Sequence, residues 1–192
     1  MSNLEDKSLE ELWELFPIML KAYNPEYPTW YEEEKASLAR VLADFDVRFI
    51  SHIGSTAVPG LIAKPIVDIL LELPKDYDAD TIIDLLRGEG WLLMARSDAD
   101  QTIDLNKGYT PSGFSKQVFH LHIKAVGDHG ELYFRDYLRA HCEAAQAYAK
   151  LKLHLKEQFE YDRDAYTDAK AEFVLECTQK AREECVGRHI HT

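Results

Sequence analysis

Two small residues at the end of a β-rich stretch form the first candidate for chemistry. Gly54 and Ser55 directly follow the segment 47–53. A small pair at such a turn lets backbone N–H groups point outward at an anion, and the Ser55 hydroxyl adds another donor. The pattern predicts a phosphate-binding turn, with an ordinary Gly-Ser turn as the alternative.

The second candidate is an acidic residue inside an apolar segment. Asp68 lies in the near-continuous apolar run 65–73, which is typical of a central strand buried on both faces. A buried, unpaired carboxylate is costly, so Asp68 should contact a cation, a metal or strong hydrogen-bond donors. Lys64, just upstream, is a candidate structural partner. A structural ion pair and a functional site therefore both remain open.

A His-Leu-His motif supplies the third candidate. His120 and His122 lie on the predicted strand 118–126 and project to one face, ~6.6 Å apart along the strand. They could bind a metal or donate to phosphate, and the alternative is two half-buried histidines bonded to neighbours. If the three candidates form one site, the Asp68 carboxylate should lie within about 8 Å of at least one imidazole.

The predicted central strand offers no second acid close to Asp68. Asp68, Leu70 and Glu72 share one strand face, and Glu72 lies ~13 Å from Asp68 along the strand. That separation is too long for a compact site whose ions lie ~4 Å apart. Leu70 holds the position where another carboxylate would be useful. One aspartate with imidazoles is a poorer site for Mg²⁺ and a better one for Mn²⁺ or Zn²⁺.

Two arginines follow the histidine strand on a predicted helix. Arg135 and Arg139 are four residues apart and share a helix face. A guanidinium on this helix could clamp phosphates in a bidentate manner, and Arg135 is the better placed of the two. The alternative is a solvated helix face with surface salt bridges.

Strand patterns dominate the middle of the chain and helical patterns its end. Besides 47–53, 65–73 and 118–126, segments 91–95 and 101–108 are predicted strands, 18–23 an edge strand and 109–116 a loop. Predicted helices cover 9–16, 30–45, 80–86, 144–159 and 164–184. This order predicts an α+β fold with a C-terminal helical layer from about residue 130.

Composition narrows the class of protein. The 192 residues suit one domain, 1–192, and the net charge of −12 argues against nucleic acid as a bulk partner. No apolar run has the length of a membrane span, and the N-terminal segment lacks a secretory apolar region. The odd number of cysteines fits a reducing compartment, so we expect a cytoplasmic protein without membrane contact.

Several long strings together resemble one family. They are HIGSTAVPGLIAKPIVDILLEL from His52, FHLHI from Phe119, YFRDYLRAHCEAAQAYAKLK from Tyr133 and DRDAYTDAKAEFV from Asp162. These strings resemble the GrpB family of bacterial proteins, over about residues 17–181. The resemblance implies a nucleotidyltransferase-like fold, with a mixed sheet, flanking helices and a C-terminal helical part.

The resemblance also implies roles for the candidate residues. In that superfamily a Gly-Ser pair precedes an acidic strand, and another acid lies on a later strand. Gly54, Ser55 and Asp68 match the first elements, Leu70 replaces the second acid, and His120 or His122 stands where the third is expected.

The implied activity is metal-dependent nucleotidyl transfer from a nucleoside triphosphate to a small-molecule or protein acceptor. Asp68 and Ser55 would act in catalysis. Phosphate binding would fall to Gly54, Ser55, Lys64 and Arg135, and metal binding to Asp68, His120 and His122. The metal would be Mg²⁺ or Mn²⁺, with Zn²⁺ as a further candidate. The alternative is a non-catalytic module that binds a nucleotide or phosphate on the same scaffold.

Overall fold

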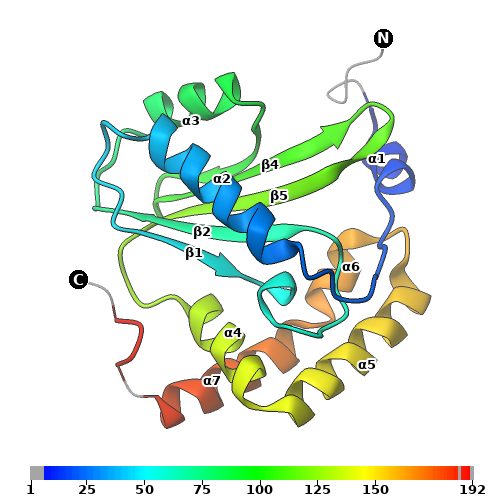
Figure 1. Cartoon of the computed structure of the whole chain (residues 1–192). Helices are drawn as coiled ribbons and strands as arrows, with labels where there is room; N and C mark the ends of the chain where they lie inside the picture. Colours follow the sequence, from blue (N-terminus) through cyan, green and yellow to red (C-terminus); the bar gives the residue numbers. More distant parts are fainter. Residues whose placement is uncertain (1–6, 186, 191–192) are drawn as a thin grey trace.

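A five-stranded mixed β-sheet forms the centre of the protein (Figure 1). The computed structural model describes residues 7–185 and 187–190. The strands are β1 (Phe49–Ile53), β2 (Val67–Leu73), β3 (Leu92–Ser97), β4 (Thr102–Thr110) and β5 (Gly113–Ala125). They lie in the order β1-β2-β5-β4-β3. β2 and β5 pair in parallel, and the other neighbouring strands are antiparallel.

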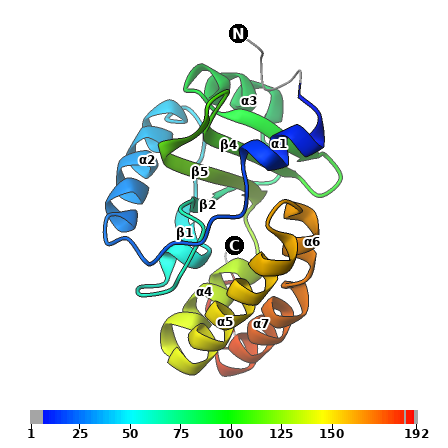
Figure 2. The same ribbon diagram turned by 90° about the vertical axis from the view of Figure 1, so that its right-hand side faces the viewer.

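Helices cover one face of the sheet and also form a separate layer. The helices near the N-terminus and the middle of the chain are α1 (Leu9–Leu15), α2 (Tyr27–Val41) and α3 (Ala79–Gly88). The later helices are α4 (Gly130–Ala140), α5 (Cys142–Phe159), α6 (Arg163–Asp168) and α7 (Ala171–Glu184). Figure 2 shows α4 to α7 gathered as one layer beside the sheet. The predicted α+β class with a C-terminal helical layer is confirmed.

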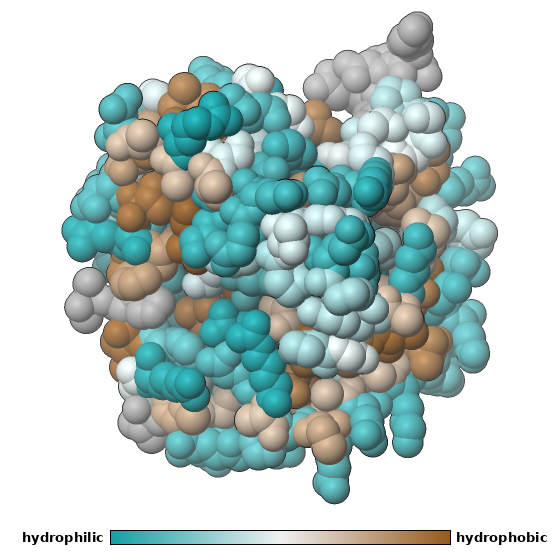
Figure 3. All heavy atoms as spheres, in the orientation of Figure 1, coloured by the Kyte–Doolittle hydropathy of each residue, from teal (hydrophilic) through white to brown (hydrophobic). Residues whose placement is uncertain are grey.

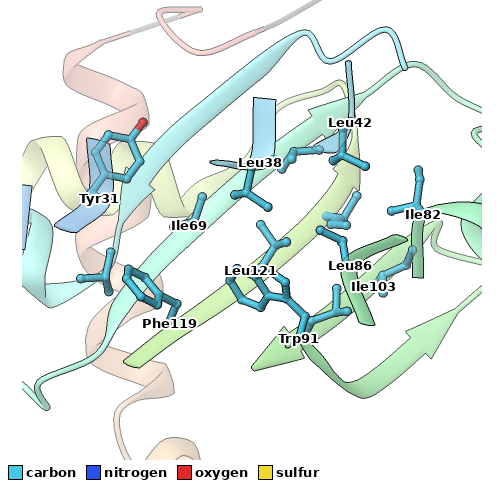
Figure 4. Close-up of a cluster of buried hydrophobic side chains, with 14 of the residues drawn as sticks. Tyr31, Leu38, Leu42, Ile69, Ile82, Leu86, Trp91, Ile103, Phe119 and Leu121 are labelled. Atoms are coloured by element: carbon cyan, nitrogen blue, oxygen red, sulfur yellow. The ribbon is translucent and has the colours of Figure 1, made fainter. Parts of the chain in front are cut away.

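The two faces of β2 have different neighbours because side chains alternate along a strand. Ile69 and Leu71 point into the main core, where they join Leu38 of α2 and Leu86 of α3 (Figure 4). All four side chains are at most 1% exposed. This core fixes β2 as an inner strand of the sheet, between β1 and β5.

The opposite face of β2 looks toward the helical layer. Leu70 is fully buried and packs with Ile53 and with Leu132 of α4. Glu72 is also fully buried, with Oε1 3.3 Å from Nε2 of His129 at the start of α4. Asp68 shares this face, so any chemistry at Asp68 takes place between the sheet and the helical layer.

Two sequence predictions about the edges of the sheet are wrong. Segment 18–23 forms no strand: its one described β-bridge joins Lys21 to Ala63, and Ile18 donates its N–H to the carbonyl of Glu160 after α5. Segment 109–116 is largely a hairpin, because β4 continues to Thr110 and β5 begins at Gly113. Gly113, with a φ of +108°, accommodates the tight reversal.

The predicted long helix 164–184 is interrupted. α6 ends at Asp168 and α7 begins at Ala171. At the break, Lys170 stands with Nζ 4.3 Å from the centre of the Tyr166 ring. Lys170 is half-buried there, and it follows Tyr166 by four residues, the spacing of neighbours on one helix face.

The surface is polar over much of the face in Figure 3, with apolar residues in scattered groups. Among the described residues, no helix combines the length and apolar character that a membrane span requires.

The burial of Leu70 leads to a stability prediction. Leu70→Ala should lower the free energy of unfolding by about 2–5 kcal/mol, because it leaves a cavity between Ile53 and Leu132. Leu70→Asp should cost more, since it adds a desolvated charge to the same loss of contacts. Urea unfolding of both variants measures the difference. Equal stability of Leu70→Asp and wild type would show that this position tolerates a second acid.

Candidate active site

The predicted acid and both histidines meet on the inner strands β2 and β5, on the face of the sheet toward the helical layer. A carboxylate oxygen of Asp68 and one ring nitrogen each of His120 and His122 all lie within 4.8 Å of one another. The parallel register explains this, because Asp68 pairs with His120 and Leu70 pairs with His122. The predicted convergence is confirmed, and the donor set fits a divalent metal. The Asp68 side chain is 27% exposed, so a ligand can reach it.

Gly54 is held against Asp68 by the pairing of β1 with β2. Ile53 pairs with Asp68, and Gly54 follows at once with a φ of +70°. A Cβ at this position would lie 2.2 Å from Oδ2 of Asp68. Only glycine fits here for both reasons. Ser55 then opens a short 3₁₀ turn, η2 (Ser55–Ala57), beside the carboxylate.

His120 uses both ring nitrogens within the protein. Nδ1 lies 3.2 Å from Oδ1 of Asp68, and Nε2 lies 2.8 Å from the hydroxyl of Tyr109 and 3.1 Å from Nη2 of Arg163. Burial lowers the pKa of His120, and the charge of Arg163 adds to this against the pull of Asp68. Burial would raise the pKa of Asp68, but the bond to His120 and nearby positive charges hold it below its usual value.

His122 is bonded to an acid that sequence analysis missed. Asp104 of β4 pairs with His122 in register, and its Oδ1 lies 2.6 Å from Nδ1 of His122. Burial lowers the pKa of His122, but the bond to Asp104 and the charge of Asp68 outweigh it and raise the pKa above its ordinary value. Polar Asp104 and Asn106 alternate with buried Ile103 and Leu105, which was the signal available in the sequence.

A buried lysine of the helical layer binds the Gly-Ser turn. Lys152 of α5 is 2% exposed, and its Nζ donates to Oγ of Ser55 at 3.0 Å and to the carbonyl of Ile62. Burial and the charge of Lys170 lower the pKa of Lys152 to about 7. Lys152 stands four residues after buried Tyr148 and three before buried Leu155. A lysine on this inner stripe was the sequence signal for its role.

Three further cations lie near Asp68. Nζ of Lys64 lies 5.6 Å from the centre of the Tyr166 ring, on which Lys170 also stacks. Burial and neighbouring cations lower the pKa of Lys64 to about 7, and burial lowers that of Lys170 to about 8. We call Lys64, Lys152, Arg163 and Lys170 the cationic cluster.

The cationic cluster contrasts with the acidic chain as a whole. The protein carries a net charge of −12, yet the charges of all four cluster residues act on one another or on Asp68. The buried hydroxyl of Tyr166 has no hydrogen-bond partner among the described residues. Mutually repelling cations, of which Lys152 is buried and the other three are half-buried, are suited to an anionic ligand beside this hydroxyl. Lys64 was predicted from the sequence, whereas the other three cations were not.

The two arginines of α4 hold the backbone near the Gly-Ser turn. Nη1 of Arg135 donates to the carbonyl of His52 at 3.1 Å, and its Nε donates to Asp136 at 2.7 Å. Nε of Arg139 donates to the carbonyl of Ala57 at 2.8 Å. Arg139 is exposed, but this bond also ties it to the backbone after the Gly-Ser turn. Phosphate binding by Arg135 stays a prediction.

A groove of about 530 Å³ lies on the other side of this turn, between residues 58–61 and helices α4 and α5. Arg139 and Cys142 line it, but none of Asp68, His120 and His122 does. The groove is thus separate from the acid and the imidazoles.

The fold and the family follow from comparison with known proteins. The chain superposes on the Cid1 poly(U) polymerase, in a structure with Mg 3′-dATP bound, with a TM-score of 0.51 over 84% of this chain and 51% of that one. At 13% identity this likeness shows the fold alone, and it agrees with the expected nucleotidyltransferase-like fold. Residues 17–180 match the family described as GrpB protein, and the chain belongs to the GrpB family.

Two similar proteins illustrate how far the sequence and the structure agree with this family. The UPF0157 protein PA4798 of Pseudomonas aeruginosa is 34% identical over 181 residues, which cover 94% of this chain and 70% of that protein. The crystal structure of the conserved protein GrpB from Enterococcus faecalis is similar with a TM-score of 0.75 and 28% identity. It covers 86% of this chain and 98% of that one.

The contact between Gly54 and Asp68 can be tested with a matched pair of glycines. Gly54→Ala should displace the Asp68 carboxylate and weaken Mn²⁺ binding at least about tenfold, the scale of disturbed ligand orientation. Gly60→Ala is the control, because Gly60 also has a positive φ, +78°, but open space around its Cβ position. Calorimetric Mn²⁺ titration and thermal melting compare the two. Equal metal affinity in both variants would contradict a role for the close approach.

The buried Lys152 predicts a pH-dependent stability. Between pH 7 and 9 the unfolded chain keeps this lysine protonated, whereas the folded protein releases the proton above its pKa of about 7. The unfolded state then binds more protons, so stability rises with pH. As the pH rises, the free energy of unfolding of the wild type should increase relative to that of Lys152→Met by up to about 1.4 kcal/mol per pH unit. Urea unfolding at each pH measures this, with the exposed Lys150→Met as control. If the difference in unfolding free energy between wild type and Lys152→Met did not change with pH, that result would contradict the lowered pKa.

Proposed function

We propose that this protein is a metal-dependent nucleotidyltransferase that acts on a small-molecule or protein acceptor. One observation carries the proposal: the carboxylate of Asp68 and two imidazoles lie within 4.8 Å of one another, beside a Gly-Ser turn bonded to Lys152. Candidate metal ligands and candidate phosphate-binding groups would thus adjoin on the face of a nucleotidyltransferase-like sheet that looks toward the helical layer.

The residues divide between metal and phosphate. Asp68 with an imidazole would hold the ion, and this donor set suits Mn²⁺ better than Mg²⁺, with Zn²⁺ as a further candidate. When bound, such an ion neutralises charge on a transferring phosphoryl group. Ser55 and the backbone of the turn would bind phosphate oxygens.

The cationic cluster would stabilise the charge of the nucleotide. Lys152 already donates to Ser55. Lys64 and Lys170 both contact the ring of Tyr166. Preorganised cations in a water-poor site stabilise developing negative charge strongly. Arg135 supports the site at least through its bond to the carbonyl of His52.

The ligand class is drawn from the Cid1 likeness and from charge. That polymerase is described with magnesium and 3′-dATP bound, which supports a nucleoside triphosphate as the donor here. The net charge of −12 disfavours long nucleic acids as the acceptor. We therefore propose a small molecule or a protein in that place.

A second candidate function is a non-catalytic module that binds a nucleotide or phosphate. Leu70 favours it, because a fully buried leucine stands where a second metal-binding acid is expected. Incubation with a nucleoside triphosphate and Mn²⁺ separates the two functions, because transfer of the nucleotidyl group to water or to a protein hydroxyl releases pyrophosphate. Turnover that depends on Asp68 supports the enzyme, and tight binding without turnover supports the module.

Replacement of Asp68 tests the site directly. Asp68→Asn should abolish Mn²⁺ binding and weaken binding of a non-hydrolysable ATP analogue, with only a small drop in melting temperature, because asparagine keeps the size of the side chain and an oxygen that can accept from His120. Titration calorimetry and thermal melting measure both effects, with the exposed Asp44→Asn as control. Retained metal binding together with a stability loss of about 3–5 kcal/mol would instead make Asp68 a structural ion-pair partner.

A further inference from the structure

The hydrogen bonds of His120 leave it no free lone pair. An arginine can only donate, so Nε2 of His120, 3.1 Å from Nη2 of Arg163, must be an acceptor. The Tyr109 hydroxyl accepts from Nη1 of Arg163 at 3.1 Å and so directs its own proton to the same Nε2, 2.8 Å away. The ring proton then sits on Nδ1, which faces Oδ1 of Asp68 at 3.2 Å.

The bonds of His122 have the opposite consequence. Asp104 is 2.6 Å from Nδ1 and, as a carboxylate, can only accept, so Nδ1 carries the proton. Among the described residues, none is seen to form a hydrogen bond with Nε2 of His122. The side chain is 32% exposed, against 12% for His120, so a ligand can approach this nitrogen.

We infer that the two histidines have different functions: His122, oriented by Asp104, is the nitrogen ligand of the metal, and His120 is a positioning residue that holds Asp68. The inference rests on the proposed metal-dependent function. A carboxylate that bonds the far nitrogen of a metal-binding histidine fixes its orientation and increases its basicity. Asp104 supplies that bond here, and Asp68 remains the carboxylate ligand.

This division limits the protein to two ligands and leaves most of the coordination sphere open. Mn²⁺ and Mg²⁺ take about six ligands, so the remaining positions would be filled by water and by phosphate oxygens. The cationic cluster lies where such phosphates would be held. Metal and nucleotide should therefore bind more tightly together than either binds alone.

Electron spin-echo spectroscopy of bound Mn²⁺ distinguishes the two histidines. The full chain loaded with Mn²⁺ alone should show the ¹⁴N coupling of one imidazole. The coupling should vanish in His122→Gln and persist in His120→Asn, since asparagine keeps an N–H donor near the position of Nδ1. Asp104→Ala should weaken Mn²⁺ binding about 10–100-fold. The exposed Asp100→Ala, with a bond to Ser97, should leave it unchanged.

A measurement on the wild-type chain guards against variants that fail to fold. Long-range ¹H–¹⁵N NMR should show His120 as the Nδ1–H tautomer with and without Zn²⁺, and the Nε2 resonance of His122 should shift on addition of Zn²⁺. A ¹⁴N coupling lost in His120→Asn but kept in His122→Gln would overturn this inference and leave the proposed function standing. A ¹⁴N coupling kept in both variants would also overturn the inference, because the imidazole that binds Mn²⁺ would then belong to another histidine. Wild type that binds no divalent metal would overturn both proposals.

Discussion

The charge of a carboxylate on an inner strand of a sheet must be balanced by its surroundings, and Asp68 determines much of what surrounds it. Its charge has been moved out of water, which is costly without partners. Gly54 leaves space for Oδ2, and His120 bonds Oδ1. The cationic cluster supplies opposite charge from farther away. The site thus consists of the residues that stabilise the charge of Asp68 in the folded protein.

The helical layer supplies what the sheet lacks. Arg163, Lys152 and Lys170 all belong to the C-terminal part of the chain, and each acts on Asp68 or on a residue beside it. The layer is held in place by Leu132 against Leu70 and by His129 against Glu72. Docking of the helices therefore creates the excess of positive charge, although the whole protein is acidic.

The sequence predicted the part of the site that local patterns encode. An acid in an apolar run, a Gly-Ser pair after a strand and a His-Leu-His motif are visible without a fold, and the structure brings all three together. The sequence did not predict Lys152, Arg163 and Asp104 as part of the site, because their roles depend on tertiary docking and on register between strands. Segment 18–23 was misjudged for a related reason, since a short apolar segment cannot show whether a strand has a neighbour along its length.

The most direct measurement is a crystal structure with Mn²⁺ and a non-hydrolysable nucleoside triphosphate, recorded at the manganese absorption edge. The anomalous peak should lie between Asp68 and His122, with phosphate oxygens on Ser55 and Lys152. A nucleotide bound in the groove beside Arg139 and Cys142, with no peak at Asp68, would contradict a metal-dependent site on this face of the sheet.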